Sequence, residues 1–258
     1  MDLNAIADNL LQAHEARARF VSFAAENGVD DIAKAYSVQE QLVARLTKSN
    51  GESVGYKIGL TSHQMQAMCG IAQPIGGRVL KQRVHASGAT VARADFGRVG
   101  LEFEIGLRLG RDLDGRNKSC SVDEIVAAID GVCAAIELVD DRNADYAKLD
   151  VLSLICDNSW NAGAVLSDFQ SMPSSLRDLE GKIFENGTLV DRGSGEDVLG
   201  DPVNSLAWLC EHLAGRGKRL RKGEIVLTGS LVKTRFPQGP TAYRYDLSDI
   251  GSISVQIT

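Results

Sequence analysis

Glycine residues divide the chain after residue 51 into short apolar segments, and this spacing limits the regular structure that can form there. Val54–Ile58 is one such segment, with a glycine inside it and another directly after it. Short strands joined by turns are typical of this pattern. The glycines that punctuate the region are Gly55, Gly59, Gly70, Gly76, Gly77, Gly88, Gly97, Gly100, Gly106 and Gly110.

The residues before Gly51 have a helical period instead. Apolar residues recur there at intervals of three and four, and we expect helices over 2–23 and 30–50. Two more helices are expected over 121–132, where Ser121 and Glu124 have capping-box spacing, and over 201–214. Alternating apolar residues predict a last strand at 253–257. The pattern therefore predicts an α+β fold, with a helical N-terminal part packed on a β-rich core.

Composition excludes several classes of protein. The 258 residues suffice for one large domain or two modest ones, and 28 basic against 34 acidic residues give a net charge of −6. This charge repels phosphate backbones and anionic membranes, so we expect neither nucleic acid nor membrane as a partner. The longest candidate span, 125–139, is interrupted by Asp130 and Glu137.

Two further features indicate a cytoplasmic protein. The five cysteines lie far apart and form no C-x-x-C pair, which is typical of a reducing compartment. Asp2 and Asn4 stand where a secretory leader would carry positive charge. We therefore expect a cytoplasmic location.

Two carboxylates alternate with apolar residues in the segment 101–107. The period of a strand places Glu102 and Glu104 on one face, opposite Leu101, Phe103 and Ile105. Such a face can simply be solvated, because antiparallel sheets commonly expose one side to water. The pair alone therefore leaves a solvated face and a binding site as alternatives.

A third carboxylate lies within an otherwise apolar segment. Glu137 is the one ionisable residue in the apolar run 132–139, and burying a carboxylate is costly unless it is paired or bound to a metal. If its strand lies beside the first, three glutamates converge on a site suited to Mg²⁺, Mn²⁺ or Ca²⁺. The alternative is a buried ion pair with Arg or Lys.

Lys57 stands alone among apolar residues and glycines in the segment 55–62. It can extend its ammonium group to water, as isolated lysines commonly do. Alternatively, it borders a binding pocket, where it can transfer a proton or stabilise a developing oxyanion.

Several segments, in this order, resemble one known family. Together they are similar to the 2-keto-4-pentenoate hydratase and 4-oxalocrotonate decarboxylase branch of the fumarylacetoacetate hydrolase superfamily, and the resemblance covers nearly the whole chain. The segments are 55–62 (GYKIGLTS), 101–105 (LEFEI), Glu137 with Asp141-Arg142, Asp157-Asn158 and 225–230 (IVLTGS).

The resemblance implies a fold and a set of site residues. It implies a mixed β-roll or β-sandwich core that carries Mg²⁺ or Mn²⁺ on Glu102, Glu104 and Glu137. Lys57 matches the pocket lysine of the family. Thr228 and Gly229 match a turn that holds the substrate carboxylate, and Asp157 matches a residue near the pocket.

The resemblance also suggests how the chain is organised. We expect a helical N-terminal region over residues 1–75, which contributes Lys57, and a catalytic core over residues 76–258. Family members of this kind further suggest a homo-oligomer built from dimers.

The chain departs from the family pattern at several positions. Many hydratases of the group have an acidic residue where this chain has Ile75, and the form with isoleucine is closer to the decarboxylases. Trp160 and Asn161 replace the small residues of well-known members, so we expect them to bind substrate and set specificity. His63 and His85 are candidates for a general base, although a lone histidine in a loop is more often solvent-exposed.

The first functional hypothesis is a metal-dependent lyase of aromatic meta-cleavage catabolism. It would hydrate a 2-hydroxy-2,4-dienoate of the 2-keto-4-pentenoate type to a 4-hydroxy-2-oxo acid. Three alternatives are a decarboxylase of a 4-oxalocrotonate-like diacid, a hydrolase of an acylpyruvate C–C bond, and a non-catalytic oligomeric binding protein on the same fold.

Overall fold

The computed structural model describes residues 2–115 and 120–258, except for the side chains of His63 and Met68. The strands are β1 (Ser53–Gly59), β2 (Ile75–Leu80), β3 (Val84–Ala86), β4 (Ala89–Val91), β5 (Val99–Leu109), β6 (Ile129–Asp140), β7 (Asn161–Leu166), β8 (Glu180–Glu185), β9 (Thr188–Ser194), β10 (Ile225–Ser230), β11 (Thr241–Leu247) and β12 (Gly251–Ile257). The α-helices are α1 (Leu3–Glu15), α2 (Ile32–Asn50), α3 (His63–Met68), α4 (Val122–Val126), α5 (Val151–Cys156) and α6 (Pro202–Ala214). The 3₁₀ helices are η1 (Ala25–Asn27), η2 (Lys81–Arg83), η3 (Arg93–Asp95), η4 (Tyr146–Lys148), η5 (Asn158–Trp160) and η6 (Gly195–Asp197).

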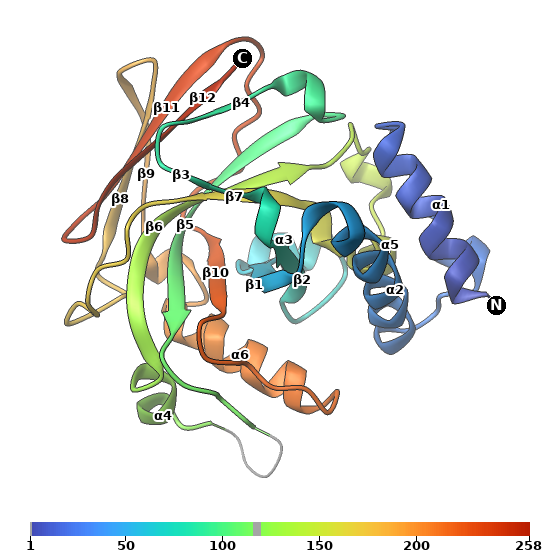
Figure 1. The fold of residues 1–258 in the computed structure, drawn as a ribbon, viewed down its shortest axis with the longest axis horizontal. Helices are drawn as coiled ribbons and strands as arrows, with labels where there is room; N and C mark the ends of the chain where they lie inside the picture. Colours follow the sequence, from blue (N-terminus) through green and yellow to red (C-terminus); the bar gives the residue numbers. More distant parts are fainter. Residues whose placement is uncertain (1, 116–119) are drawn as a thin grey trace.

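Two sheets form the core of the molecule (Figure 1). The larger has the strand order β2-β1-β10-β5-β6-β7-β3, and the smaller has the order β4-β12-β11-β8-β9. Apolar residues of β5 pack against the smaller sheet, where the rings of Phe103 and Tyr245 lie 5.7 Å apart in an edge-on arrangement. The alternation along β5 thus turns Leu101, Phe103 and Ile105 into this core and leaves the even-numbered residues on the opposite face. The expected α+β fold is confirmed.

The helices α1, α2 and α5 gather beside the larger sheet, away from the smaller one (Figure 1). Asp2 and Asp31 accept hydrogen bonds from the first turns of α1 and α2, which explains where both helices begin. Leu10, Leu42 and Ile155 belong to one apolar cluster that holds the three helices together. The helical N-terminal part therefore packs onto the β core.

The helix expected over 121–132 is much shorter in the structure. The capping box of Ser121 and Glu124 is present, but α4 ends at Val126. Residues from Ile129 onward belong to β6, which pairs with β5 as far as Asp140. Here the pairing of two long strands outweighs the local helical pattern.

Strand β1 lies inside the larger sheet. It runs parallel to β10 and antiparallel to β2, with which Gly59 and Ile75 form a register pair. A division of the chain at residue 75 would separate two paired strands, and the two-part organisation stays a prediction. Among the described residues, no helix combines the length and the apolar character needed to cross a bilayer.

Candidate metal and active site

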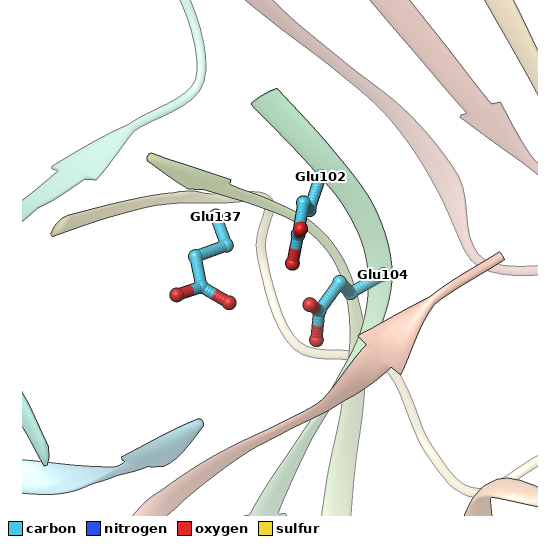
Figure 2. Close-up of side chains that lie close together, drawn as sticks. All are labelled: Glu102, Glu104 and Glu137. Atoms are coloured by element: carbon cyan, nitrogen blue, oxygen red, sulfur yellow. The ribbon is translucent and has the colours of Figure 1, made fainter. Parts of the chain in front are cut away.

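The strand register brings the three predicted glutamates together. Strands β5 and β6 pair so that Glu102 stands directly opposite Glu137, with Glu104 two residues further along β5. One carboxylate oxygen from each of the three lies within 4.8 Å of those of the other two (Figure 2). Like charges directly opposite one another destabilise a sheet. The cluster is therefore unfavourable unless a positive charge compensates it.

Burial increases the cost of this cluster. Glu104 and Glu137 are fully buried, whereas Glu102 is partly exposed. The alternative of a solvated polar face does not hold for these residues. A hydrated face would have left all three carboxylates in water.

Lys57 supplies one positive charge. Its strand is separated from β5 by β10, and its Nζ lies 3.2 Å from Oε1 of Glu137. The side chain is buried, so it does not extend its ammonium group to bulk water. Of the two interpretations of this lysine, the structure supports the one beside a pocket.

Each glutamate also accepts one hydrogen bond from a neutral donor. The amide Nδ2 of Asn161 lies 2.9 Å from Glu137 Oε1, and the backbone N–H of Gly229 lies 2.7 Å from Glu104 Oε2. The hydroxyl of Thr234 donates to Glu102 Oε1 at 2.6 Å. These donors fix the orientation of all three carboxylates.

Two carboxylate oxygens have no partner among the residues that the structure describes. Glu104 Oε1 and Glu137 Oε2 are buried and accept no hydrogen bond from any of these residues. Leaving a buried carboxylate oxygen unsatisfied is costly. Three oxygen donors with free positions are the ligand type that Mg²⁺ and Mn²⁺ prefer. The residues therefore fit a hard divalent cation.

The pKa values of the cluster reflect the same crowding. Burial, reinforced by the neighbouring carboxylates, raises the pKa of Glu104 well above its usual value. Burial also raises the pKa of Glu137 to about 7, although Lys57 opposes the shift. For Lys57, burial alone would lower the pKa, but the charges of the three glutamates outweigh it and raise the value to about 12. Lys57 is thus held in its charged form by the cluster.

A cavity of about 520 Å³ adjoins Lys57 and Glu102. One wall is apolar and continuous with the cluster that joins the N-terminal helices. This wall consists of Leu60, Ile75, Val139, Tyr146, Leu149, Leu154 and Trp160. The lining also includes the polar residues Thr61, Ser62, Ser230, Lys233 and Thr234. The cavity can thus hold a small acid with an apolar portion.

Thr228 and Gly229 make their contacts within the protein. The hydroxyl of Thr228 donates to the backbone oxygen of Ile105, and the N–H of Gly229 donates to Glu104. Gly229 has a φ of +116°, and a Cβ there would lie 2.3 Å from Oγ1 of Thr61. Only glycine therefore fits at this turn. The predicted contact of both residues with a substrate carboxylate stays a prediction.

The other predicted substrate-binding residues lie in different surroundings. Trp160 lines the cavity, whereas Asn161 reaches Glu137 from β7. Asp157 is buried beside the cluster of N-terminal helices, where its carboxylate contacts His14 at 2.6 Å and Arg142 at 2.8 Å. It is absent from the described lining of the cavity. Its contacts support a structural role.

Of the two candidate histidines, only His85 has a side chain among the described residues. His85 lies on β3, the edge strand of the larger sheet, and does not line the cavity. The side chain of His63 lies outside the described residues.

Of the three donors that hold the glutamates, Thr234 was not predicted from the sequence, whereas Asn161 and Gly229 were predicted only as substrate-binding residues. Thr234 follows β10 in an irregular segment without periodicity, so no pattern distinguishes it. Asn161 was singled out by its departure from the family pattern after Asp157-Asn158, but that departure did not indicate a contact with Glu137. The hydrogen bonds of Thr234 to Glu102 and of Asn161 to Glu137 cannot be predicted unless the pairing of the strands is known.

Comparison with known proteins identifies related chains. Residues 73–258 match the family model described as fumarylacetoacetate (FAA) hydrolase C-terminal. The chain is 32% identical over 266 residues to the 2-keto-4-pentenoate hydratase of Burkholderia vietnamiensis (strain G4), which covers 100% of this chain and 99% of the relative. It is also 32% identical over 257 residues to the 2-oxo-hept-4-ene-1,7-dioate hydratase of Escherichia coli, covering 96% and 95% of the two chains.

A solved structure is similar over the same length. The 4-oxalocrotonate decarboxylase from Pseudomonas putida G7, complexed with magnesium and adipate, superposes with a TM-score of 0.92 at 27% identity. The match covers 99% of this chain and 97% of the other. The similarity therefore includes the helical N-terminal part as well as the β core.

Proposed function

The chain belongs to the fumarylacetoacetate hydrolase family, and from this premise we propose that it is a divalent-metal-dependent hydro-lyase. The proposed reaction hydrates a 2-hydroxy-2,4-dienoate of the 2-keto-4-pentenoate type to a 4-hydroxy-2-oxo acid, in aromatic meta-cleavage catabolism. One observation carries the proposal. Among the described residues, two buried glutamates with unpartnered oxygens lie beside a third glutamate, Glu102, and a buried lysine, Lys57, and these last two line a cavity large enough for such an acid.

Glu102, Glu104 and Glu137 are the proposed ligands of Mg²⁺ or Mn²⁺. When bound there, such an ion polarises the oxygens of a 2-oxo acid and stabilises the negative charge that develops beside the carbonyl group. The donors Asn161, Gly229 and Thr234 keep the carboxylates in place before the ion arrives. This preorganisation limits the reordering needed when the site is filled.

Lys57 is the proposed proton carrier. It lines the cavity, and its Nζ stays protonated beside the glutamates. It can therefore donate a proton to the carbon chain of a bound dienol, or stabilise the enolate oxygen. Trp160 and the other residues of the apolar wall would contact the carbon chain of the substrate.

A second candidate function is decarboxylation of a 4-oxalocrotonate-like diacid. The observation that favours it is the position of Ile75 close to Lys57. A Cβ placed on Gly59 would lie 3.6 Å from Cγ1 of Ile75 and 3.2 Å from Nζ of Lys57, so both side chains border the same point of the cavity. Ile75 cannot activate a water molecule. An apolar wall also destabilises a carboxylate placed against it, which favours the loss of CO₂. For acylpyruvate hydrolysis the described residues offer no comparable observation, because His85 is not among those that line the cavity.

The experiment compares enzymatically generated 2-hydroxy-2,4-dienoates and 2-oxo diacids in Mg²⁺ and in EDTA. Loss of the dienol ultraviolet absorbance without CO₂, abolished by EDTA, is the result expected for a hydratase. Stoichiometric CO₂ from the diacid supports the second candidate. If neither substrate class is consumed in Mg²⁺ or Mn²⁺, the lyase proposal is wrong and a binding protein on this fold is favoured.

The proposal extends to the setting of the enzyme. We propose a cytoplasmic homo-oligomer built from dimers, as suggested by the family resemblance. Light scattering coupled to size-exclusion chromatography measures the subunit number directly, and a monomer would contradict this part.

A further inference from the structure

Three consecutive residues beside the cavity adopt a left-handed backbone. Asn158, Ser159 and Trp160 have φ angles of 51°, 50° and 59°. Residues other than glycine adopt this region at an energetic cost, and a run of three is unusual. Backbone strain of this kind persists only where the surroundings fix it. The turn is therefore held by specific contacts.

Those contacts tie the turn to β2. Asn158 exchanges two hydrogen bonds with the backbone of Arg78, at 2.7 Å and 2.9 Å. The hydroxyl of Ser159 donates to the backbone oxygen of Gly76 at 3.0 Å. A Cβ at Gly77 would lie 2.5 Å from the backbone oxygen of Asn158, so the absence of a side chain there permits this close approach. The turn thus has one fixed position relative to the sheet.

The residue that follows the turn is Asn161, the first residue of β7. Its Nδ2 lies 2.9 Å from Oε1 of Glu137, and its second contact, with the backbone oxygen of Gly163, is long at 3.5 Å. The same Oε1 faces the ammonium of Lys57 at 3.2 Å. Both donors thus act on one oxygen of Glu137, and Oε2 remains buried and unpartnered.

We propose that Asn161 is a positioning residue that fixes the carboxylate of Glu137 so that Oε2 is free to coordinate the cation. This inference rests on the proposed metal site. Without the amide, Lys57 alone would hold Oε1, and the carboxylate would be free to rotate or to offer both oxygens to the ammonium. The strained turn explains why the amide stands at this point of the sheet.

The test measures Mg²⁺ affinity by calorimetry on the full-length protein after removal of metal with EDTA. Asn161→Ala is expected to weaken Mg²⁺ binding about 10- to 100-fold, as is typical when a residue that orients a metal ligand is lost. Asn161→Leu keeps more of the side-chain volume and should show the same loss. Asn27→Ala is the matched control, because it removes an exposed amide that donates only to the backbone oxygen of Phe23.

Circular dichroism and thermal unfolding establish that each variant is folded. A purely structural role for Asn161 would lower the unfolding temperature and leave the Mg²⁺ Kd of the folded protein unchanged. Mg²⁺ affinity within twofold of wild type in either folded variant therefore overturns the proposal.

The outcome is separable from that of the proposed function. If wild type itself binds no Mg²⁺ or Mn²⁺, the metal site fails as a whole. If wild type binds the ion and Glu137→Gln does not, but the Asn161 variants bind normally, only the positioning role is wrong.

Discussion

The Nζ of Lys57 lies 3.2 Å from Oε1 of Glu137, and their side chains are 5% and 0% exposed. A buried pair of this kind contributes little net stability, because both groups lose their hydration. Its position at the cavity instead suits chemistry, since the lysine is held charged and lines the cavity.

Replacing this lysine separates catalysis from metal binding. Lys57→Met is expected to lower kcat by about 10²–10⁴-fold, because a positioned acid–base group is lost. Mg²⁺ affinity should not fall, since the substitution removes a positive charge beside the carboxylates. Steady-state kinetics and calorimetry measure the two effects, with Lys81→Met, at an exposed pair with Glu52, as control. Normal kcat in Lys57→Met would exclude the proton role.

Replacing a proposed metal ligand should lower both Mg²⁺ affinity and turnover. Glu104→Gln keeps the shape of the side chain but removes its charge, so we expect Mg²⁺ affinity and turnover each to fall at least about 100-fold, beyond the effect of losing a neighbouring donor. Titration calorimetry and the ultraviolet assay provide the two readouts. Glu52→Gln, at an exposed site, should match wild type. Full metal affinity in Glu104→Gln would show that the ligand assignment is wrong.

The buried pair of Arg142 and Asp157 is expected to act on stability. Burial alone would raise the pKa of Asp157, but its interactions with His14 and Arg142 outweigh burial and lower it. Arg142→Met leaves that carboxylate buried with less compensation, and the free energy of unfolding should fall by about 3–5 kcal/mol. Arg177→Met, from a pair more than half exposed, should change it by about 1 kcal/mol or less.

Urea denaturation of both arginine variants measures the difference. At a temperature where Arg142→Met remains folded, its Mg²⁺ affinity should stay close to that of wild type. A large loss of affinity in the folded variant would instead indicate that Asp157 takes part in the site.

His212 should make stability depend on pH. Burial, with the charges of Arg216 and Lys218, lowers its pKa from 6.5 to about 4. Between these values the unfolded chain binds a proton that the folded chain does not, so stability falls as the pH drops from about 6.5 toward 4. Above this window His212 is neutral in both states and makes no pH-dependent contribution.

The matched variant is His212→Phe, which keeps a ring stacked on Trp208 and close to Tyr36. Urea unfolding at pH 7.5, 6 and 5 should show wild type losing stability relative to this variant as the pH falls. A constant difference across the three pH values would contradict the shift.

The sequence was informative where a local period sufficed. The period of two in β5 placed Glu102 and Glu104 on one face, and the isolation of Glu137 in an apolar run indicated a buried carboxylate. The sequence pattern could not predict the strand register that places Glu102 opposite Glu137. Register depends on contacts between segments far apart in the chain, and alternation alone leaves it open.

The hydrogen bonds to the glutamates could not be predicted for a related reason. Asn161 contacts Glu137 directly after a left-handed turn, and no residue of that turn is a glycine. Local preference argues against such a turn, and contacts with β2 impose it. The short α4 is a milder case, in which strand pairing overrode a helical pattern.

The charges of the three glutamates and Lys57 also affect the order in which a metal ion and a substrate bind. When all three carboxylates are ionised, as ligands of a cation would be, they and the ammonium of Lys57 sum formally to −2. A divalent cation brings the sum to zero. Because the pKa values of Glu104 and Glu137 are raised in the metal-free site, binding of the ion should release protons, and an anionic acid should bind more tightly once the ion is in place.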